Sequence, residues 1–170
     1  MIISLIIIIF LIALDQVTKF LASSYLMGGT DVSFIKGFIT FSYVENNGAA
    51  YGIFSNNQLI LAIITFVALI GFGYLFTLTS YKNKKVFSLA VVFIISGTLG
   101  NALDRVTLGY VIDFLYYPFL ERMLGSIGSF SNNFSDLYLP VGMILLAIHI
   151  LFLEKPKKKE KDGNSNSTKS

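Results

Sequence analysis

Four apolar stretches dominate the pattern of hydrophobic and polar positions along the chain. A membrane-spanning helix needs about twenty predominantly apolar residues, and only the fourth stretch is somewhat short of that length. The stretches are Met1 to about Leu26, Leu59 to Leu78, Val86 to about Leu103, and Leu137 to Leu153. The pattern predicts a mainly α-helical membrane protein with four transmembrane helices.

The first of the two long loops has a pattern typical of β-structure. Between Phe38 and Val44, β-favouring residues alternate in part with polar ones, and Asn46-Asn47-Gly48 favours a turn. We therefore expect a small β element at the membrane surface, from Phe38 to Gly52. The second long connection, Val106 to Asn133, is rich in aromatic residues and glycine, and we expect a long loop there.

Composition narrows the possible functions. Hydrophobic residues make up 54% of the 170 positions, which excludes a soluble domain of ordinary composition. The chain has no cysteine and a single histidine, His149, so disulfides, thiol nucleophiles and His-rich metal clusters are excluded. The lysines cluster beside apolar segments, which fits lipid headgroups and gives no indication of nucleic-acid binding. We expect one membrane domain over residues 1–153 and a basic, disordered tail over 154–170.

Basic residues are distributed unequally between the loops. Three lysines lie in the short loop between the second and third spans, and more follow the last span. The two long loops and their edges hold only Lys36, Arg105 and Arg122. The positive-inside rule then places the short loop, the tail and both termini in the cytoplasm. Both long loops are expected on the outer side.

This topology brings most of the unusual polar residues into one layer. Asp15, Thr18 and Lys19 share a helix face at positions i, i+3 and i+4, as do Asn101, Asp104 and Arg105. Both groups fall at the outer ends of their helices. The other residues of this layer are Asn46, Asp113 and Asp136. Unrelated interface charges would be spread over both faces, so the shared layer predicts one composite site. His149 is expected near the opposite face, without a catalytic role.

Local structural roles explain some of these residues. Lys19 is expected to extend to the interface with Asp15 as its partner, and Asp104 and Arg105 to form a buried pair at the end of the third helix. Gly97 lies one turn before Asn101 and would let another helix approach closely.

Two carboxylates placed close together share a proton, because both cannot easily ionise. The ionised one can then take a proton from water while the protonated one polarises a carbonyl, which is chemistry that cleaves amides. A divalent metal is disfavoured, since Arg105 and Lys19 would compete with it for the carboxylates. A small proton-coupled transporter or channel subunit is an alternative, but it would need ionisable residues along the whole route. A membrane scaffold explains the charges as interface pairs but not their common layer.

Several segments of the chain resemble those of a known family, the lipoprotein signal peptidases (signal peptidase II). The likeness covers the membrane body and rests on five segments in order. These segments are Asp15-Gln16-Val17-Thr18-Lys19, Asn46-Asn47-Gly48-Ala49-Ala50, Gly97 to Arg105, Val111-Ile112-Asp113-Phe114, and Asn133-Phe134-Ser135-Asp136.

The resemblance implies an aspartic endopeptidase in which Asp113 and Asp136 are the catalytic pair. It also implies a set of residues that support the site or bind substrate: Asp15, Lys19, Asn46, Gly48, Gly97, Asn101, Asp104, Arg105 and Asn133. It further implies a prolipoprotein substrate, cut before a diacylglyceryl-modified cysteine, and a location in the bacterial cytoplasmic membrane with the site near the outer face. No metal or other cofactor is implied, and we expect a monomer in contact with membrane lipid.

The chain departs from the family pattern at four places. Glu45 stands where the family usually has a basic residue, Asn132 replaces a usual Phe, and Ser135 replaces a usual Ala. The segment between Asp113 and Asp136 is also longer than usual.

Overall fold

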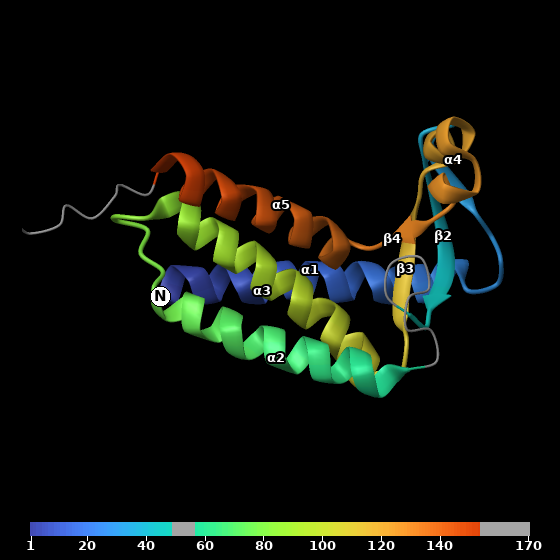
Figure 1. The fold of residues 1–170 in the computed structure, drawn as a ribbon. Coiled ribbons are helices and arrows are strands. Elements are labelled where there is room, and N and C mark those ends of the chain that lie inside the picture. Colours follow the sequence, from blue (N-terminus) through green and yellow to red (C-terminus); the bar gives the residue numbers. More distant parts are fainter. Residues whose placement is uncertain (49–56, 154–170) are drawn as a thin grey trace, which may run out of the picture.

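Four long helices form the body of the molecule (Figure 1). The computed structural model describes residues 1–48 and 57–153. The helices are α1 (Ile2–Leu26), α2 (Gln58–Thr77), α3 (Lys85–Thr107) and α5 (Phe134–Ile148), and α5 continues as a π-helix over His149–Leu153. Within the described residues, all four are long and apolar enough to cross a membrane. The predicted spans are confirmed, although α3 continues past Leu103.

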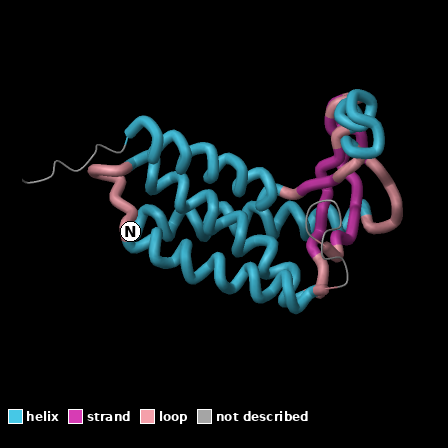
Figure 2. The backbone as a smooth tube through the Cα atoms, viewed as in Figure 1, coloured by secondary structure: helices cyan, strands magenta, loops and turns pink. Residues whose placement is uncertain are grey.

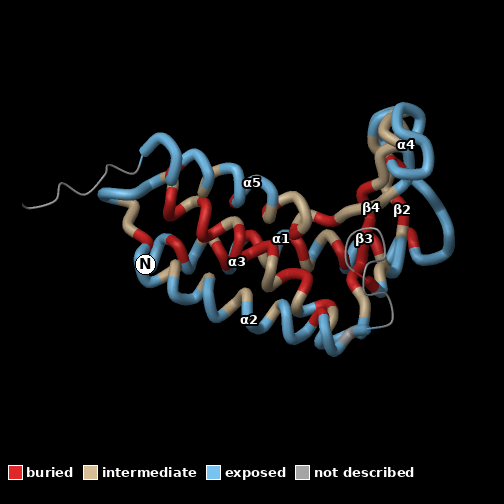
Figure 3. Tube along the Cα trace, in the orientation of Figure 1, coloured by how far each residue is buried: buried red, intermediate tan, exposed pale blue. Residues whose placement is uncertain are grey.

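Helix α3 is the centre of the bundle and packs against α1, α2 and α5. Buried positions follow its length, whereas the other three helices expose much of their apolar surface (Figure 3). That surface is stable in a membrane because lipid, not water, surrounds it. Two glycines allow α3 and α5 to approach closely. A Cβ at Gly97 would lie 2.5 Å from the Ser135 carbonyl oxygen, and one at Gly142 would lie 2.7 Å from Ile94 Cγ1. The expectation for Gly97 is confirmed.

A four-stranded antiparallel sheet lies across one end of the bundle (Figures 1 and 2). Its strands, in spatial order, are β1 (Val32–Ile35), β2 (Ile39–Asn46), β3 (Val111–Tyr116) and β4 (Ser131–Asn132). The prediction of a β element in the first loop is confirmed, but it was incomplete, because half of the strands come from the second loop. The predicted end of the element, Ala49 to Gly52, lies outside the described residues.

The second connection also contains a short helix, α4 (Pro118–Leu124), followed by a 3₁₀ turn over Gly125–Gly128. The expectation of a plain loop was therefore wrong. The local signals were present: proline at the start of the helix, Glu121 in its first turn, and Gly125 after its end with φ of 63°.

Apolar contacts fasten the sheet to the bundle. Ala22 and Leu26 at the end of α1 form a buried cluster with Ile112, Phe114 and Leu115 of β3. These residues flank Asp113, so the packing holds that carboxyl group above the helix ends. The predicted tail, 154–170, lies outside the described residues. The N-terminus and the C-terminal end of the last helix lie at the end opposite the sheet (Figure 1).

Candidate active site

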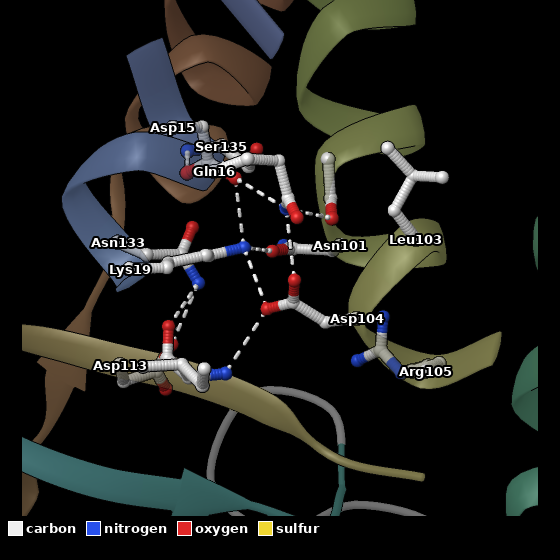
Figure 4. A network of polar contacts seen from close by, with 12 residues as sticks. Asp15, Gln16, Lys19, Asn101, Leu103, Asp104, Arg105, Asp113, Asn133 and Ser135 are labelled. Atoms are coloured by element: carbon white, nitrogen blue, oxygen red, sulfur yellow. Dashed lines mark hydrogen bonds and ion pairs between the residues drawn. The ribbon is translucent and has the colours of Figure 1, made fainter. Parts of the chain in front are cut away.

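The polar residues singled out in the sequence converge where α1, α3 and α5 meet the sheet (Figure 4). Most of them are buried. Hydrogen bonds and ion pairs join the following predicted residues into one network: Asp15, Lys19, Asn46, Gly48, Asn101, Asp104, Arg105, Asp113, Asn133 and Asp136. The remaining predicted residue, Gly97, contributes the close helix contact described above.

Lys19 is the central cation of this network. Its side chain is 2% exposed, and its Nζ lies 2.8 Å from Asp15 Oδ2 and 2.9 Å from Asp104 Oδ2. It also donates a hydrogen bond to Asn101 Oδ1 at 2.9 Å. The expectation that Lys19 extends to the interface was therefore wrong. The expected pairing of Asp104 with Arg105 was also wrong, because Lys19 is the ion-pair partner of Asp104.

The two carboxylates bound to Lys19 each reach a different part of the backbone. Asp15 Oδ1 accepts a hydrogen bond from the Ser135 amide in the first turn of α5, at 2.9 Å. Asp104 Oδ2 accepts one from the Ile112 amide of β3, at 3.1 Å. Through these contacts Lys19 holds together the segments that carry Asp136 and Asp113.

All four oxygens of Asp113 and Asp136 accept a hydrogen bond from nitrogen. Asn133 Nδ2 donates to Asp113 Oδ1 at 2.7 Å, and Asn46 Nδ2 donates to Oδ2 at 2.9 Å. Asn101 Nδ2 donates to Asp136 Oδ1 at 2.7 Å, and the Asn133 backbone amide donates to Oδ2 at 3.2 Å. Asn133 contacts both carboxyl groups, because it caps α5 in a capping box with Asp136.

The orientation of each asparagine amide is determined by a donor that binds its oxygen. Asn46 Oδ1 accepts from the Gly48 amide, Asn101 Oδ1 from Lys19, and Asn133 Oδ1 from the Asp136 amide. An amide rotated the other way would place its NH₂ group against these donors. The three NH₂ groups therefore point at the carboxyl pair.

Burial, together with the nearby charge of Asp136, raises the pKa of Asp113 to about 7. Hydrogen bonds from Asn46 and Asn133 and the charge of Lys19 oppose this rise in pKa. A carboxyl group with a pKa near 7 retains its proton at neutral pH far more often than an ordinary aspartate does. The pair can therefore hold one proton between its two members.

A cleft of about 1200 Å³ opens beside the pair and is lined by residues of β2, β3, α3 and α5. Both aspartates line it, together with Asn46, Asn101 and Arg105. Arg105 donates a hydrogen bond from Nη2 to the Gly48 carbonyl at 3.1 Å, while its Nε has no partner among residues 1–48 and 57–153. Leu139 and Pro140 form part of the cleft wall on α5. The cleft thus offers acid–base groups beside both a cationic and an apolar wall.

Three contributors to the site were not predicted. Gln16 Nε2 donates to Asp104 Oδ1 at 2.8 Å, the Ser135 amide binds Asp15, and a Cβ at Gly100 would clash with the Ser135 side chain. Gln16 follows Asp15 directly, and consecutive helix residues point in different directions. The spacing rule that grouped Asp15 with Lys19 therefore left Gln16 out.

The charged residues of the described spans do not form a path through the membrane. They lie at the sheet end, apart from Lys85 at the start of α3. His149 is at the opposite end, buried against the Phe87 ring, as predicted. The segments described contain no cluster of three or more His, Cys, Asp or Glu residues with metal-binding geometry. Four spanning helices, with the buried Asp113 and the half-buried Asp136 beside a cleft, define a multi-pass membrane protein with its polar site at one end of the bundle.

Comparisons with known proteins identify the family. The family model described as signal peptidase (SPase) II matches residues 7–152. Lipoprotein signal peptidase of Clostridium tetani is 41% identical over 148 residues, which cover 86% of this chain and 91% of that protein. The lipoprotein signal peptidase of Clostridioides difficile is 38% identical, with coverage of 91% and 98%. The chain belongs to the signal peptidase II family and is a membrane peptidase.

The fold agrees with this assignment. A solved structure described as a bacterial membrane enzyme is 30% identical, covers 89% of this chain and 94% of its own, and superposes with a TM-score of 0.74. A second structure with the same description gives a TM-score of 0.75 and coverage of 93% for both chains. The comparisons give no support to the transporter alternative.

Proposed function

We propose that this peptidase is an aspartic endopeptidase that removes signal peptides from diacylglyceryl-modified prolipoproteins by cutting before the lipidated cysteine. The observation that carries the proposal is the carboxyl pair, Asp113 and Asp136, which lines one cleft and is held by N–H donors on all four oxygens. The relatives named lipoprotein signal peptidase support the choice of substrate.

Cleavage follows from one proton shared by the pair. The ionised carboxylate accepts a proton from water as the water oxygen bonds to the scissile carbonyl carbon, and the protonated partner donates its proton to the carbonyl oxygen. The resulting diol then gives a hydroxyl proton to the carboxylate that is now ionised. As the C–N bond breaks, the cysteine nitrogen takes the proton that the other carboxyl group received from water, so the pair again holds one proton. The products are a signal-peptide carboxylate and a free amino group on the lipidated cysteine.

The surrounding residues have positioning and binding roles in this proposal. Asn46, Asn101 and Asn133 aim the carboxyl pair, and Lys19 orients Asn101 and ties the pair together through Asp15 and Asp104. Arg105 and Gly48 are placed to bind the substrate backbone. Their shared hydrogen bond and the position of Arg105 on the cleft wall support this role.

The substrate must reach the site from within the membrane, since its signal peptide is apolar and its cysteine carries lipid. The positive-inside rule supports a topology with both termini in the cytoplasm and the site near the outer face of a bacterial cell membrane. The enzyme would act there as a monomer without a cofactor.

The proposed function predicts strict dependence on lipidation. The purified protein should cut a diacylglyceryl-modified precursor and release a chain that begins with the lipidated cysteine. The same precursor without the lipid should be cut at least about 100-fold more slowly, because its acyl chains supply binding energy of about 0.8 kcal/mol per buried methylene. Mass spectrometry of the products checks both points. Equal cleavage of the two precursors would reject the proposed substrate, and cleavage of neither would reject the activity.

Cleavage should fall as pH rises through about 7. Because burial raises the pKa of Asp113 to about 7, the pair holds its shared proton below that pH and loses it above. The single-turnover rate should then decrease by about tenfold per pH unit on the alkaline side. Asn46→Ala removes a hydrogen bond that lowers this pKa, so it should move the fall to higher pH. A rate that is flat around pH 7 in both proteins would contradict the shared proton.

Chelation should leave cleavage unchanged. The carboxylates Asp15 and Asp104 are already paired with Lys19, and the asparagine amides face the other two with their N–H groups, which cannot bind a cation. The test is the cleavage rate of purified protein before and after treatment with EDTA and with phenanthroline. Activity lost on treatment and restored by zinc or magnesium would overturn the aspartic mechanism.

A further inference from the structure

One apolar surface is explained neither by the helix bundle nor by the cleft. It consists of the end of β1 and the turn that follows it, together with α4 and the 3₁₀ turn after that helix, and is here called the tip. Six large apolar side chains of the tip are exposed: Phe34, Ile35, Phe38, Met123, Leu124 and Ile127. Met123 is 75% exposed and Ile127 is 65% exposed. Large apolar side chains gathered in this way on neighbouring exposed segments are typical of an interaction site.

The tip is one structural unit, although its two halves lie far apart in the sequence. Arg122 Nη2 donates a hydrogen bond to the Gly37 carbonyl at 2.7 Å. The rings of Phe38 and Phe119 pack with their centroids 5.5 Å apart. The exposed side chains of the turn and of α4 therefore keep fixed positions relative to one another.

The position of the tip indicates what covers it. The strands run across the end of the bundle, so α4 lies to one side of it, beyond α5 (Figure 1). In a membrane, the space beside α5 is filled by lipid, because α5 exposes Val141, Met143 and Ile144. The tip thus extends sideways over the lipid that contacts α5.

Charge and aromatic residues also fit a lipid headgroup layer. Lys36 and Arg122 are two of the three basic residues in the long loops, and both lie in the tip. The nearby acid Glu121 accepts a hydrogen bond from the Tyr116 hydroxyl. Tyr116 and Tyr117 are of the aromatic type that is enriched at membrane interfaces. Exposed cations beside apolar side chains are the combination that binds anionic headgroups.

We propose that the tip is an interfacial anchor that inserts its apolar side chains into the lipid surface beside α5, with a preference for anionic headgroups. The anchor lies within the segment that joins the two aspartates, since β3 leads from Asp113 into α4 and β4 leads back to Asp136. Lipid contact at the tip therefore restrains β3 and β4, the strands that lead to Asp113 and Asp136. This second consequence rests on the proposed function, but the anchoring itself does not.

The absence of tryptophan from the chain permits a direct test of insertion. Ile127→Trp places a single indole on the tip, Phe66→Trp places one on the exposed middle of α2, and Asn83→Trp places one in the short basic loop. In proteoliposomes, Ile127→Trp should be quenched most strongly by lipids brominated near the glycerol backbone, and Phe66→Trp by lipids brominated deep in the chain. If brominated lipid quenches the emission of Ile127→Trp no more than the emission of Asn83→Trp, the proposed anchor is wrong.

Headgroup preference and the effect on the site need a second experiment. The protein is reconstituted in phosphatidylcholine alone or in an equal mixture with phosphatidylglycerol, and cleavage is compared with that in detergent micelles. Cleavage should be several-fold faster in the anionic vesicles, and Lys36→Gln should reduce this gain while the matched loop variant Lys82→Gln retains it. Met123→Ser with Ile127→Ser should slow cleavage in vesicles but not in micelles.

The quenching and cleavage experiments together distinguish failure of the anchor from failure of the proposed function. The coupling of the anchor to the site is rejected by the following pair of results. The wild-type protein cuts in micelles at the same rate as in both kinds of vesicle, and the double variant is as active as the wild type in all three media. A wild-type protein inactive in every medium rejects the proposed function and leaves the quenching result to decide on the anchor.

Discussion

Replacing either Asp113 or Asp136 by asparagine should abolish cleavage of a lipidated precursor while the protein still folds and inserts. An amide has nearly the size of a carboxyl group, but it can neither hold the shared proton nor accept one from water. General acid–base catalysis contributes about 10²–10⁴-fold per group, so the rate should fall by at least that factor. Quantitative gel analysis of precursor and product, with equal amounts of folded enzyme, provides the measurement.

Two comparisons sharpen this prediction. The double variant should be no worse than either single variant, because the two carboxyl groups act as a unit. Glu121→Gln is the matched control, since Glu121 is an exposed carboxylate on α4 that does not line the cleft, and it should keep the wild-type rate. Asp15→Asn should have a smaller effect than the catalytic variants. Substantial cleavage by Asp113→Asn or by Asp136→Asn would reject the assignment of the pair.

Replacing Lys19 by methionine should lower the free energy of unfolding by about 3–5 kcal/mol, because it leaves two buried carboxylates without their cation. Methionine retains the unbranched apolar stem, so the change mainly removes charge and hydrogen bonds. Lys19 lies 2.8 Å from Asp15 and 2.9 Å from Asp104. Denaturation of the purified protein in mixed micelles, followed by circular dichroism, gives the unfolding free energy.

Lys82→Met serves as the control, because Lys82 is an exposed lysine in the short loop. It should change the unfolding free energy by less than about 0.5 kcal/mol. Adding Asp104→Asn to Lys19→Met should restore part of the loss, since one unpaired charge is removed. A Lys19→Met protein as stable as the Lys82→Met protein would show that the buried ion pairs do not hold the site together.

The departures from the family pattern have distinct structural settings. Glu45 is exposed on β2, where its carboxylate accepts a hydrogen bond from the Tyr43 hydroxyl at 3.2 Å. Asn132 pairs with Leu115 across β4 and β3. Ser135 is fully buried, and its Oγ has no partner among the described residues, so the useful contact at this position comes from its backbone amide. The longer segment between the aspartates contains α4 and the 3₁₀ turn, which form one half of the tip.

Local features of the sequence were sufficient to predict the spans and the layer that holds the site. A membrane helix needs a long apolar run with its backbone hydrogen-bonded internally, and both properties belong to the segment itself. Asp15, Lys19, Asn101 and Asp104 could be grouped by helical spacing for the same reason. Asn46, Asp113 and Asp136 were placed in the same layer from the topology alone.

Only the tertiary structure decided which polar groups contact one another. Lys19 pairs with Asp104 on another helix rather than extending to the interface, because α1 and α3 pack together and bury it. Strand β3 forms because β2 supplies a partner across a long stretch of intervening chain, and β4 forms because β3 supplies its partner. No local pattern specifies these pairings. Asn133 contacts both Asp113 and Asp136 because the packing of β3 against the start of α5 brings the two carboxyl groups to it. Helical spacing and hydropathy describe single segments, whereas the contacts that aim the carboxyl pair depend on the packing of several segments at once.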